Sequence, residues 1–187
     1  MTVRPAVLPE VLLFDTGAFR DHRGTFRELW HAERYAALAL RERFVQDNVS
    51  VSRPGVLRGL HAQHPRPQGK LVSVLQGAVY DVAVDVRRGS PTFGQWTGEH
   101  LGADDGRQMY VPPGFAHGFV VVSEVEAVVL YKCTEFYAAG SDLAIAWNDP
   151  AIGVEWPVER PILSEKDASA PTLADVQPDR LPTFPAG

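Results

Sequence analysis

The sequence has little of what several protein classes require. Cys133 is the single cysteine among 187 residues, so no intrachain disulfide can form and no cysteine-rich zinc site can be built. No apolar run reaches the roughly 20 residues that a membrane helix needs, and the N-terminus lacks the apolar core of a signal peptide. These absences predict a soluble, cytoplasmic protein with no membrane partner.

Positive charge is also scarce, because the formal net charge is −5. A surface that follows nucleic-acid phosphates needs clustered Lys and Arg, so we expect no nucleic-acid partner. A small anionic ligand stays compatible with the composition, since a pocket can be basic in an acidic chain. Hydrophobic residues make up 45% and charged residues 22%, which is ordinary for a folded protein of this length. We therefore expect one domain over residues 1–187.

What the chain does contain is strand-like alternation. The segments Gln68–Val86 and Phe119–Tyr131 each hold two Val-rich runs, separated at Gly77 and at Ser123-Glu124. Their period of two predicts strands, and the short separations favour hairpins. Shorter strand-like runs lie at residues 11–14 and 26–30. Gly or Pro punctuates most intervals, so the pattern indicates a mainly β protein, a sandwich or barrel.

Helical signal is weak. Only His31–Phe44 combines good helix formers with apolar spacing near 3.6, and it predicts one surface helix. The tail from Ala168 onward is rich in proline, so we expect loop with one short helix around Thr172–Val176.

Two segments resemble the paired motifs of metal-binding cupins. Pro112–His117 fits the second motif, P-x-G-x-x-H. In the first motif, the position of the ligand Glu upstream of a Gly holds Lys70, upstream of Gly77. The positions that should supply His-x-His fall among residues 65–67, which are Pro-Arg-Pro. The resemblance therefore implies a cupin-type jelly roll with no metal in its pocket.

Lys70 places a cation where a metal-binding carboxylate would stand. It could take over the electrostatic work of the metal by stabilising an oxyanion in a pocket shielded from water. The ordinary alternative for a strand lysine is a solvated side chain.

The histidine of RGLH, residues 58–61, would alone indicate only a structural or surface residue. It gains weight because six blocks occur together in one order. They are FRDHRGTFRE at Phe19–Glu28, QDNVSVSRPGVLRGLH at Gln46–His61, YVPPGFAHGF at Tyr110–Phe119, YKCTEFY at Tyr131–Tyr137, WNDPAIGVEWP at Trp147–Pro157 and LSEKD at Leu163–Asp167.

Together these blocks resemble the dTDP-4-dehydrorhamnose 3,5-epimerase family, from about Phe14 to Asp167. The resemblance implies a jelly-roll homodimer in which N-terminal strands complete the partner's sheet. The implied substrate is a dTDP-linked 4-keto-6-deoxyhexose, and no metal or organic cofactor is implied.

The chemistry of such a substrate sets its own requirements. A ketone at C4 acidifies the hydrogens on C3 and C5, because their removal gives an enolate with its charge on O4. Inversion needs a base on one face of the ring and an acid on the other. The resemblance implies that His61 is the base, Asp167 orients it, Tyr131 is the acid and Lys70 faces the enolate oxygen. Tyr137 is the alternative acid.

The resemblance also assigns residues to the nucleotide diphosphate, and Arg suits phosphate because its planar fork forms paired hydrogen bonds. Asp81 resembles a carboxylate that lies near the catalytic His and Lys, although a solvated strand Asp would look the same. The residues implied in binding are Arg23, Glu28, Gln46, Asp47, Asn48, Arg58, Lys70, His117, Asp142 and Lys166.

The chain departs from the family pattern at a few positions. Ala62 replaces an aromatic residue, which we expect to widen the sugar pocket. Asp142 stands where a Glu is usual.

Three other functions stay open at this point. The first is an epimerase that inverts only C3 or only C5 in another deoxysugar pathway. The second is a sugar-binding cupin without catalysis, which would have lost the base, the acid or the orienting Asp. The third is a metal-dependent cupin such as a dioxygenase, against which the missing ligands count.

Overall fold

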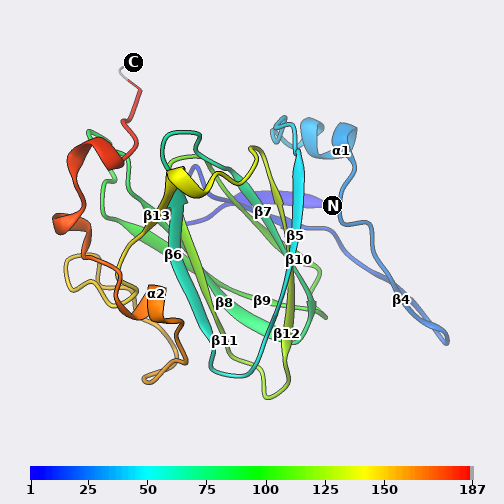
Figure 1. The fold of residues 1–187 in the computed structure, drawn as a ribbon. Coiled ribbons are helices and arrows are strands. Elements are labelled where there is room, and N and C mark those ends of the chain that lie inside the picture. Colours follow the sequence, from blue (N-terminus) through cyan, green and yellow to red (C-terminus); the bar gives the residue numbers. More distant parts are fainter. Residues whose placement is uncertain (186–187) are drawn as a thin grey trace.

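The computed structural model describes residues 1–185, which fold into two β-sheets packed face to face (Figure 1). The larger sheet contains, from one edge to the other, β1 (Thr2–Pro5), β2 (Leu12–Asp15), β10 (Arg107–Val111), β7 (Lys70–Gln76), β12 (Ala127–Cys133) and β5 (Gln46–Ser52). The smaller sheet contains β13 (Asp142–Ala144), β6 (Leu57–Gln63), β11 (Phe115–Val121), β8 (Ala78–Asp85) and β9 (Trp96–Gly102). The expected β-sandwich is confirmed.

Alternation along the strands builds the main core between the sheets. Val72 and Val74 on β7 are fully buried there, and Val79 and Ala83 reach the same cluster from β8. Successive side chains of a strand point to opposite faces, so Val82 and Val84, at the alternate positions of β8, face outward.

Both outer faces are partly covered. On the smaller sheet, Leu60, Val82 and Val84 pack beneath the C-terminal segment through Leu173 and Val176. On the larger sheet, a second outer cluster joins Leu71 and Tyr110 to the segment at residues 30–44.

The strands around Gly77 and around Ser123-Glu124 are confirmed, but the two expected hairpins are wrong. β7 pairs with β10 and β12, whereas β8 pairs with β9 and β11. Likewise β11 and β12 lie in different sheets. Each short connection carries the chain from one sheet to the other. The two connections contact each other, because Ser123 Oγ accepts from Ala78 N at 3.0 Å.

The helix expected over His31–Phe44 is much shorter, since α1 covers only Ala32–Ala37. Tyr35 is fully buried and donates its hydroxyl to Leu29 O at 2.9 Å. Ala39 then adopts a φ of 70°, which turns the chain so that Leu40 is buried too. The apolar residues anchor the segment to the sheet instead of extending a surface helix.

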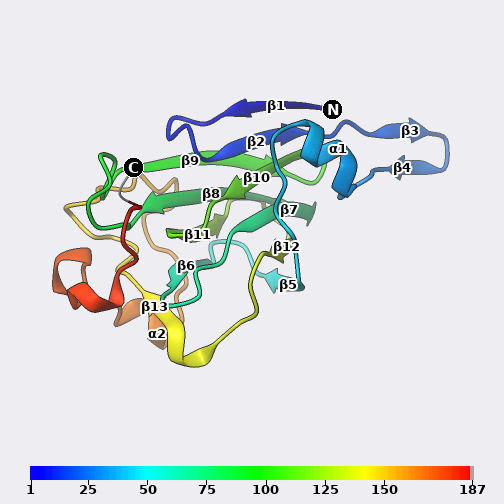
Figure 2. The same ribbon diagram turned by 90° about the horizontal axis from the view of Figure 1, so that it is seen from above.

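The N-terminal strands agree with the expectation in part. The strand-like run at residues 11–14 corresponds to β2, which lies between β1 and β10. The strand expected at residues 26–30 is limited to β4 (Gly24–Phe26), which pairs with β3 (Phe19–Asp21). This β3–β4 hairpin projects away from the sandwich, as Figures 1 and 2 both show.

The C-terminal segment is loop-rich, as expected. Beyond α2 (Glu165–Ala168), it has short 3₁₀ turns at Leu173–Asp175, near the predicted helix, and at Pro178–Arg180. A further 3₁₀ turn lies at Ala139–Ser141. The last residues of the expected loop, 186–187, lie outside the described residues. Among residues 1–185, none of the helices is long and apolar enough to cross a membrane.

Candidate active site

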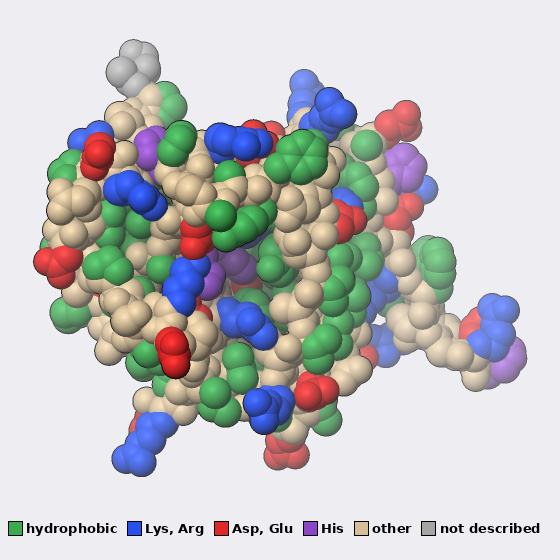
Figure 3. Space-filling view, viewed as in Figure 1, with side chains coloured by type: hydrophobic (Ala, Val, Ile, Leu, Met, Phe, Trp, Pro, Cys, Tyr) green, Lys and Arg blue, Asp and Glu red, His purple; other side chains and the backbone are tan. Residues whose placement is uncertain are grey.

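Two adjoining cavities lie between the two sheets, lined by residues of β6 in the smaller sheet and of β7 and β12 in the larger. One has a volume of about 180 Å³ and includes Gln46, Asn48 and Asp142 in its lining. The other, of about 280 Å³, includes Arg58, His117 and Lys166. Both are lined by His61, Lys70 and Tyr131. Figure 3 shows a hollow in this face of the molecule, with His side chains inside it and Lys and Arg side chains beside it.

The glycine of RGLH determines where His61 lies. Gly59 has a φ of 120°, and a Cβ placed on it would stand 2.5 Å from Gly118 Cα. Only glycine allows β6 and β11 to approach so closely at this backbone conformation. The register then places His61 opposite His117, next to an irregularity in the strand pairing.

His61 and Asp167 form a close pair. The carboxylate of Asp167 accepts a hydrogen bond from His61 Nε2 at 2.5 Å, which leaves Nδ1 with its lone pair. The His61 side chain is 33% exposed, whereas that of Asp167 is 4% exposed. Burial opposes ionisation of Asp167, but the hydrogen bonds from His61 and Ser164, together with the positive charge nearby, outweigh it and lower the pKa of the carboxyl group. The pair is therefore an imidazole held by a buried carboxylate.

Lys70 and Tyr131 enter the same cavities from the opposite sheet. Burial lowers the pKa of the Lys70 ammonium, with Cys133, Asp142 and Asp81 acting in the other direction. Burial raises the pKa of the Tyr131 phenol, so the group keeps its proton at neutral pH. The site thus combines a buried lysine whose pKa is lowered with a protonated phenol.

His117 belongs to a second histidine–carboxylate pair. Its Nε2 lies 2.7 Å from Asp81 Oδ1, and both side chains are buried. The predicted proximity of Asp81 to the site is therefore seen in the structure, although the cavity lining contains His117 and not Asp81.

The opening of the cavities carries a charged pair. The Lys166 ammonium donates a hydrogen bond to the Asp142 carboxylate, and this ion pair joins α2 to the start of β13. Arg58 is exposed on β6, and its guanidinium donates to Ser52 Oγ at 2.9 Å. Lys166 and Arg58 both line the larger cavity, so two cations face the same space.

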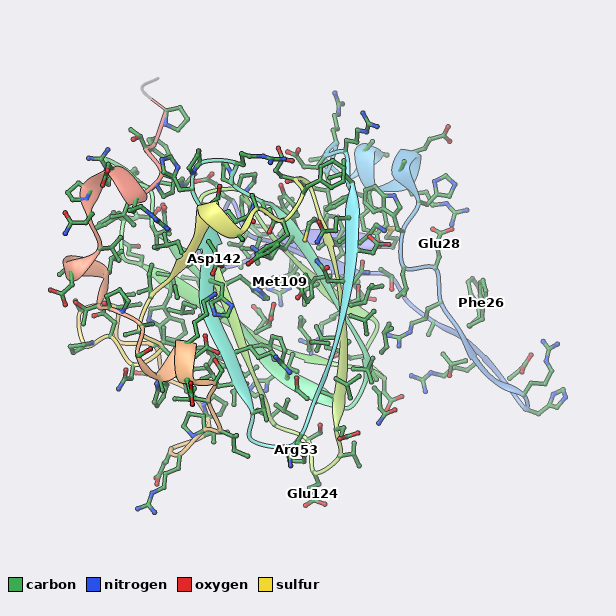
Figure 4. The ribbon with its side chains drawn as sticks, viewed as in Figure 1. Phe26, Glu28, Arg53, Met109, Glu124 and Asp142 are labelled. Carbon is green, nitrogen blue, oxygen red and sulfur yellow. The ribbon has the colours of Figure 1, made fainter. Side chains whose placement is uncertain are left out.

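Three residues implied in binding lie elsewhere. Arg23, 79% exposed, pairs with Asp21 at the turn of the β3–β4 hairpin. Glu28 accepts from Arg34, and Figure 4 shows Glu28 on the projecting arm, remote from Asp142. Asp47 points to the outer side of β5, where it pairs with Lys132. Within one chain, these residues do not reach the cavities.

Gln46, Asn48 and Tyr137 do line the smaller cavity, as the sequence implied. Four further lining residues were missed: Gln63 and Gln68 in the smaller cavity, and Phe119 and Ser164 in the larger. Gln63 is buried and accepts from Ala138 N at 2.8 Å, which holds the segment beneath Tyr137. Ser164 lies in the larger cavity beside Asp167. The signal for Ser164 was its place before the acidic turn of LSEKD, where serine is a preferred helix cap.

The expected widening of the pocket at Ala62 stays a prediction. Ala62 borders the smaller cavity, yet it belongs to the apolar cluster on the outer face of β6, with Leu60 and Leu143. Strand alternation explains this, because His61 occupies the inward position.

No group of three or more His, Cys, Asp or Glu side chains is arranged to hold a metal ion anywhere in residues 1–185. The position that a carboxylate ligand takes in metal cupins is held by Lys70.

Comparisons with known proteins agree with this geometry. The family model for dTDP-4-dehydrorhamnose 3,5-epimerase matches residues 5–175. A curated dTDP-4-dehydrorhamnose 3,5-epimerase from Pseudomonas aeruginosa is 52% identical over 170 residues, covering 90% of this chain and 93% of that protein.

Two solved structures have the same fold. A dTDP-6-deoxy-D-glucose-3,5-epimerase from Legionella pneumophila, in complex with dTDP-4-keto-L-rhamnose, aligns with a TM-score of 0.95 at 46% identity and covers 99% of both chains. A 3'-monoepimerase from Streptomyces bikiniensis, in complex with dTDP-quinovose, aligns with a TM-score of 0.88 at 34% identity, covering 96% of this chain and 92% of that one. The chain belongs to the dTDP-4-dehydrorhamnose 3,5-epimerase family.

Proposed function

We propose that the protein epimerises dTDP-4-keto-6-deoxy-D-glucose at C3 and C5 to give dTDP-4-keto-L-rhamnose, acting as one domain in the cytoplasm. The observation that carries the proposal is the set of His61, paired with Asp167, together with Lys70 and Tyr131 around one pair of cavities. Identities of 52% and 46% to 3,5-epimerases support inversion at both carbons.

His61 is the proposed base. Its Nε2–H is bound by Asp167, so Nδ1 is free to take the hydrogen from C3 or C5. The imidazole becomes an imidazolium, and the nearby carboxylate stabilises this new charge. The electron pair of the broken C–H bond moves into an enolate, whose charge rests on O4.

Lys70 is the proposed stabiliser of that enolate. Its ammonium is buried, where a fixed charge acts through a lower dielectric than in water. A cation already placed beside O4 needs no reorganisation as the negative charge develops.

Tyr131 is the proposed acid, with Tyr137 as the alternative. Tyr131 lines both cavities together with His61, from the opposite sheet, and its phenol stays protonated at neutral pH. Delivery of its proton to the ring face opposite His61 inverts the carbon. Tyr137 is more than half exposed and lines only the smaller of the two cavities, which favours Tyr131.

The dTDP diphosphate is proposed to bind on the side of Arg58, His117 and Lys166. Arg58 and Lys166 supply positive charge there, and a guanidinium matches phosphate oxygens in pairs. Gln46, Asn48 and Asp142 are proposed to contact the substrate in the smaller cavity.

A homodimer would explain the remote binding residues. Val49 and Val51 are exposed on the edge strand β5, in register beside Leu130 and Val128. This uncovered apolar face is suited to a second copy of the chain. In such a dimer, the projecting β3–β4 hairpin would bring Arg23 to the partner's site, with Glu28 and the backbone of Asp47 as further contacts.

An epimerase that inverts one carbon is the second candidate, because a 3'-monoepimerase shares the fold at a TM-score of 0.88. Its lower identity of 34% makes it the weaker candidate. A binding protein without catalysis is disfavoured, since the base, its carboxylate partner and the acid are all present.

Proton NMR in deuterated water tests the proposal. With dTDP-4-keto-6-deoxy-D-glucose as substrate, we expect deuterium to enter at both C3 and C5. Exchange at one carbon would favour the monoepimerase, and exchange at neither would overturn the proposal. His61→Ala should abolish exchange at both carbons and leave the affinity for dTDP nearly unchanged.

A further inference from the structure

The carboxylate of Asp167 has two partners, one for each oxygen. Oδ1 accepts from His61 Nε2, and Oδ2 accepts from the Ser164 hydroxyl at 2.9 Å. The same hydroxyl accepts from Asp167 N at 3.1 Å. One serine hydroxyl can donate once and accept at the same time, so both bonds to Asp167 form together.

This arrangement follows from the start of α2. Ser164 is the N-cap, with extended backbone angles, and Asp167 is the third helical residue. In a usual capping box, the acidic side chain at this position returns to the N-cap backbone. Here the Asp167 carboxylate instead lies between the N-cap hydroxyl and His61, and its side chain is only 4% exposed.

We propose that Ser164 is a positioning residue for the base, acting on His61 through Asp167. The inference rests on the proposed function of His61. The hydroxyl fixes the rotation of the carboxylate, so that Oδ1 stays directed at Nε2 and the imidazole keeps one tautomer and orientation. Hydrogen bonding from Ser164 also helps to keep Asp167 ionised, because it lowers the pKa of the buried carboxyl.

A structural cap and a positioning group make different demands. A cap needs only an acceptor for the helix N–H, and glycine replaces serine there at little cost in stability. Holding the carboxylate needs a hydroxyl donor, which threonine retains and glycine lacks. Ser164→Gly and Ser164→Thr therefore separate the two roles.

The chain contains a matched control. Thr172 is the N-cap residue of the 3₁₀ turn Leu173–Asp175; its side chain makes no capping bond to the backbone, but its hydroxyl donates to Asp175 Oδ2 at 2.6 Å. This is the same hydroxyl-to-carboxylate contact three residues along the chain, at an exposed position outside both cavities. Thr172→Gly removes it without touching the site.

The experiment measures kcat, KM and C3 deuterium exchange for the three variants. We expect Ser164→Gly to lower kcat and the exchange rate together by about tenfold or more, the effect of losing a hydrogen bond to a charged group. KM should change little, because the substrate contacts remain. Ser164→Thr should restore most of the rate, and Thr172→Gly should behave as the wild type.

Full kcat in Ser164→Gly, or a Thr variant as slow as the Gly variant, would overturn the inference. A second measurement does not depend on turnover. The short His61–Asp167 bond should give a far-downfield proton NMR signal in the wild type, and this signal should weaken or broaden in Ser164→Gly but not in Thr172→Gly. An unchanged signal would also overturn the inference. A wild type that gives this signal without any exchange would refute the proposed function alone.

Discussion

At the scale of single residues, the site depends on side chains whose environments differ from water. Asp167 is buried yet ionised, Lys70 is buried with a lowered pKa, and Tyr131 is partly buried and protonated. Each condition suits one step of the proposed reaction. Asp167 stabilises the charge on the imidazolium, Lys70 stabilises the charge on the enolate, and Tyr131 supplies the proton that returns to the carbon. Sequence reasoning could assign these roles by resemblance, but the burial that tunes each group depends on the fold.

The pH dependence of kcat tests Lys70. Its pKa is lowered from the usual lysine range, so its charge is present at lower pH and is lost as pH rises through the folded-state value. The Tyr131 pKa is raised, and its proton is therefore lost only at higher pH. We expect kcat to fall on the alkaline side below the usual lysine range of about 10.4.

Two variants of Lys70 test whether its titration causes the fall of kcat at alkaline pH. Lys70→Arg keeps its charge throughout and should remove this fall if the variant folds, whereas Lys70→Gln should lower kcat by about 10²–10³ at every pH. Lys132→Arg, on the outer side of β12, should leave the profile unchanged. An unaltered fall of kcat in Lys70→Arg would assign the titration to another group.

At the scale of elements, sequence periodicity predicted where the strands lie better than it predicted which strands pair with each other. The runs on either side of Gly77 are β7 and β8, but they cross between sheets instead of forming a hairpin. Alternation reports which face a side chain takes, and pairing depends on contacts far apart in sequence. The prediction of a helix over His31–Phe44 was wrong in its length for a related reason, because Tyr35 and Leu40 pack against the sheet.

The close approach of β6 and β11 gives a prediction at this scale. Gly59→Ala would place a Cβ 2.5 Å from Gly118 Cα at a φ of 120°. Strain of this kind costs about 1–3 kcal/mol, and the clash adds to it. We expect a clear fall in the free energy of unfolding, measured with urea, and loss of turnover because His61 moves.

Gly55→Ala is the control, with a φ of 74° and no atom within 4 Å of the added Cβ. It should cost only about 1–2 kcal/mol of backbone strain and retain activity. Equal effects of the two substitutions would show that the contact with Gly118 is unimportant.

At the scale of the whole molecule, one chain brings the proposed catalytic groups together but leaves Arg23 far from them. The hairpin that carries Arg23 projects from the sandwich, with Phe19 and Phe26 exposed on it (Figures 2 and 4). The sequence resemblance implied both the homodimer and the binding role of Arg23. Within one chain Arg23 does not reach the cavities, so it can bind substrate only if the protein is a dimer.

Mixing two impaired variants, assayed at a substrate concentration below the raised KM, tests this arrangement. Arg23→Ala should raise KM, and His61→Ala should abolish turnover. In a mixed dimer, the subunit with intact His61 would receive Arg23 from its partner, so one complete site is restored. We expect activity in the mixture above the sum of the separate variants, and light scattering should give the mass of a dimer. A monomer, or a mixture without gain, would contradict the shared site.

The central claim is that His61 and Tyr131 act on opposite faces of the sugar ring. The most direct measurement is proton NMR of the substrate with Tyr131→Phe in deuterated water. Because His61 and Lys70 remain, proton removal should continue, and the enolate can regain a deuteron only from the His61 side. We expect deuterium at C3 with the original configuration, while epimerised product falls by about 10²–10⁴. Normal epimerisation by Tyr131→Phe, together with its loss in Tyr137→Phe, would contradict the account and assign the acid to Tyr137.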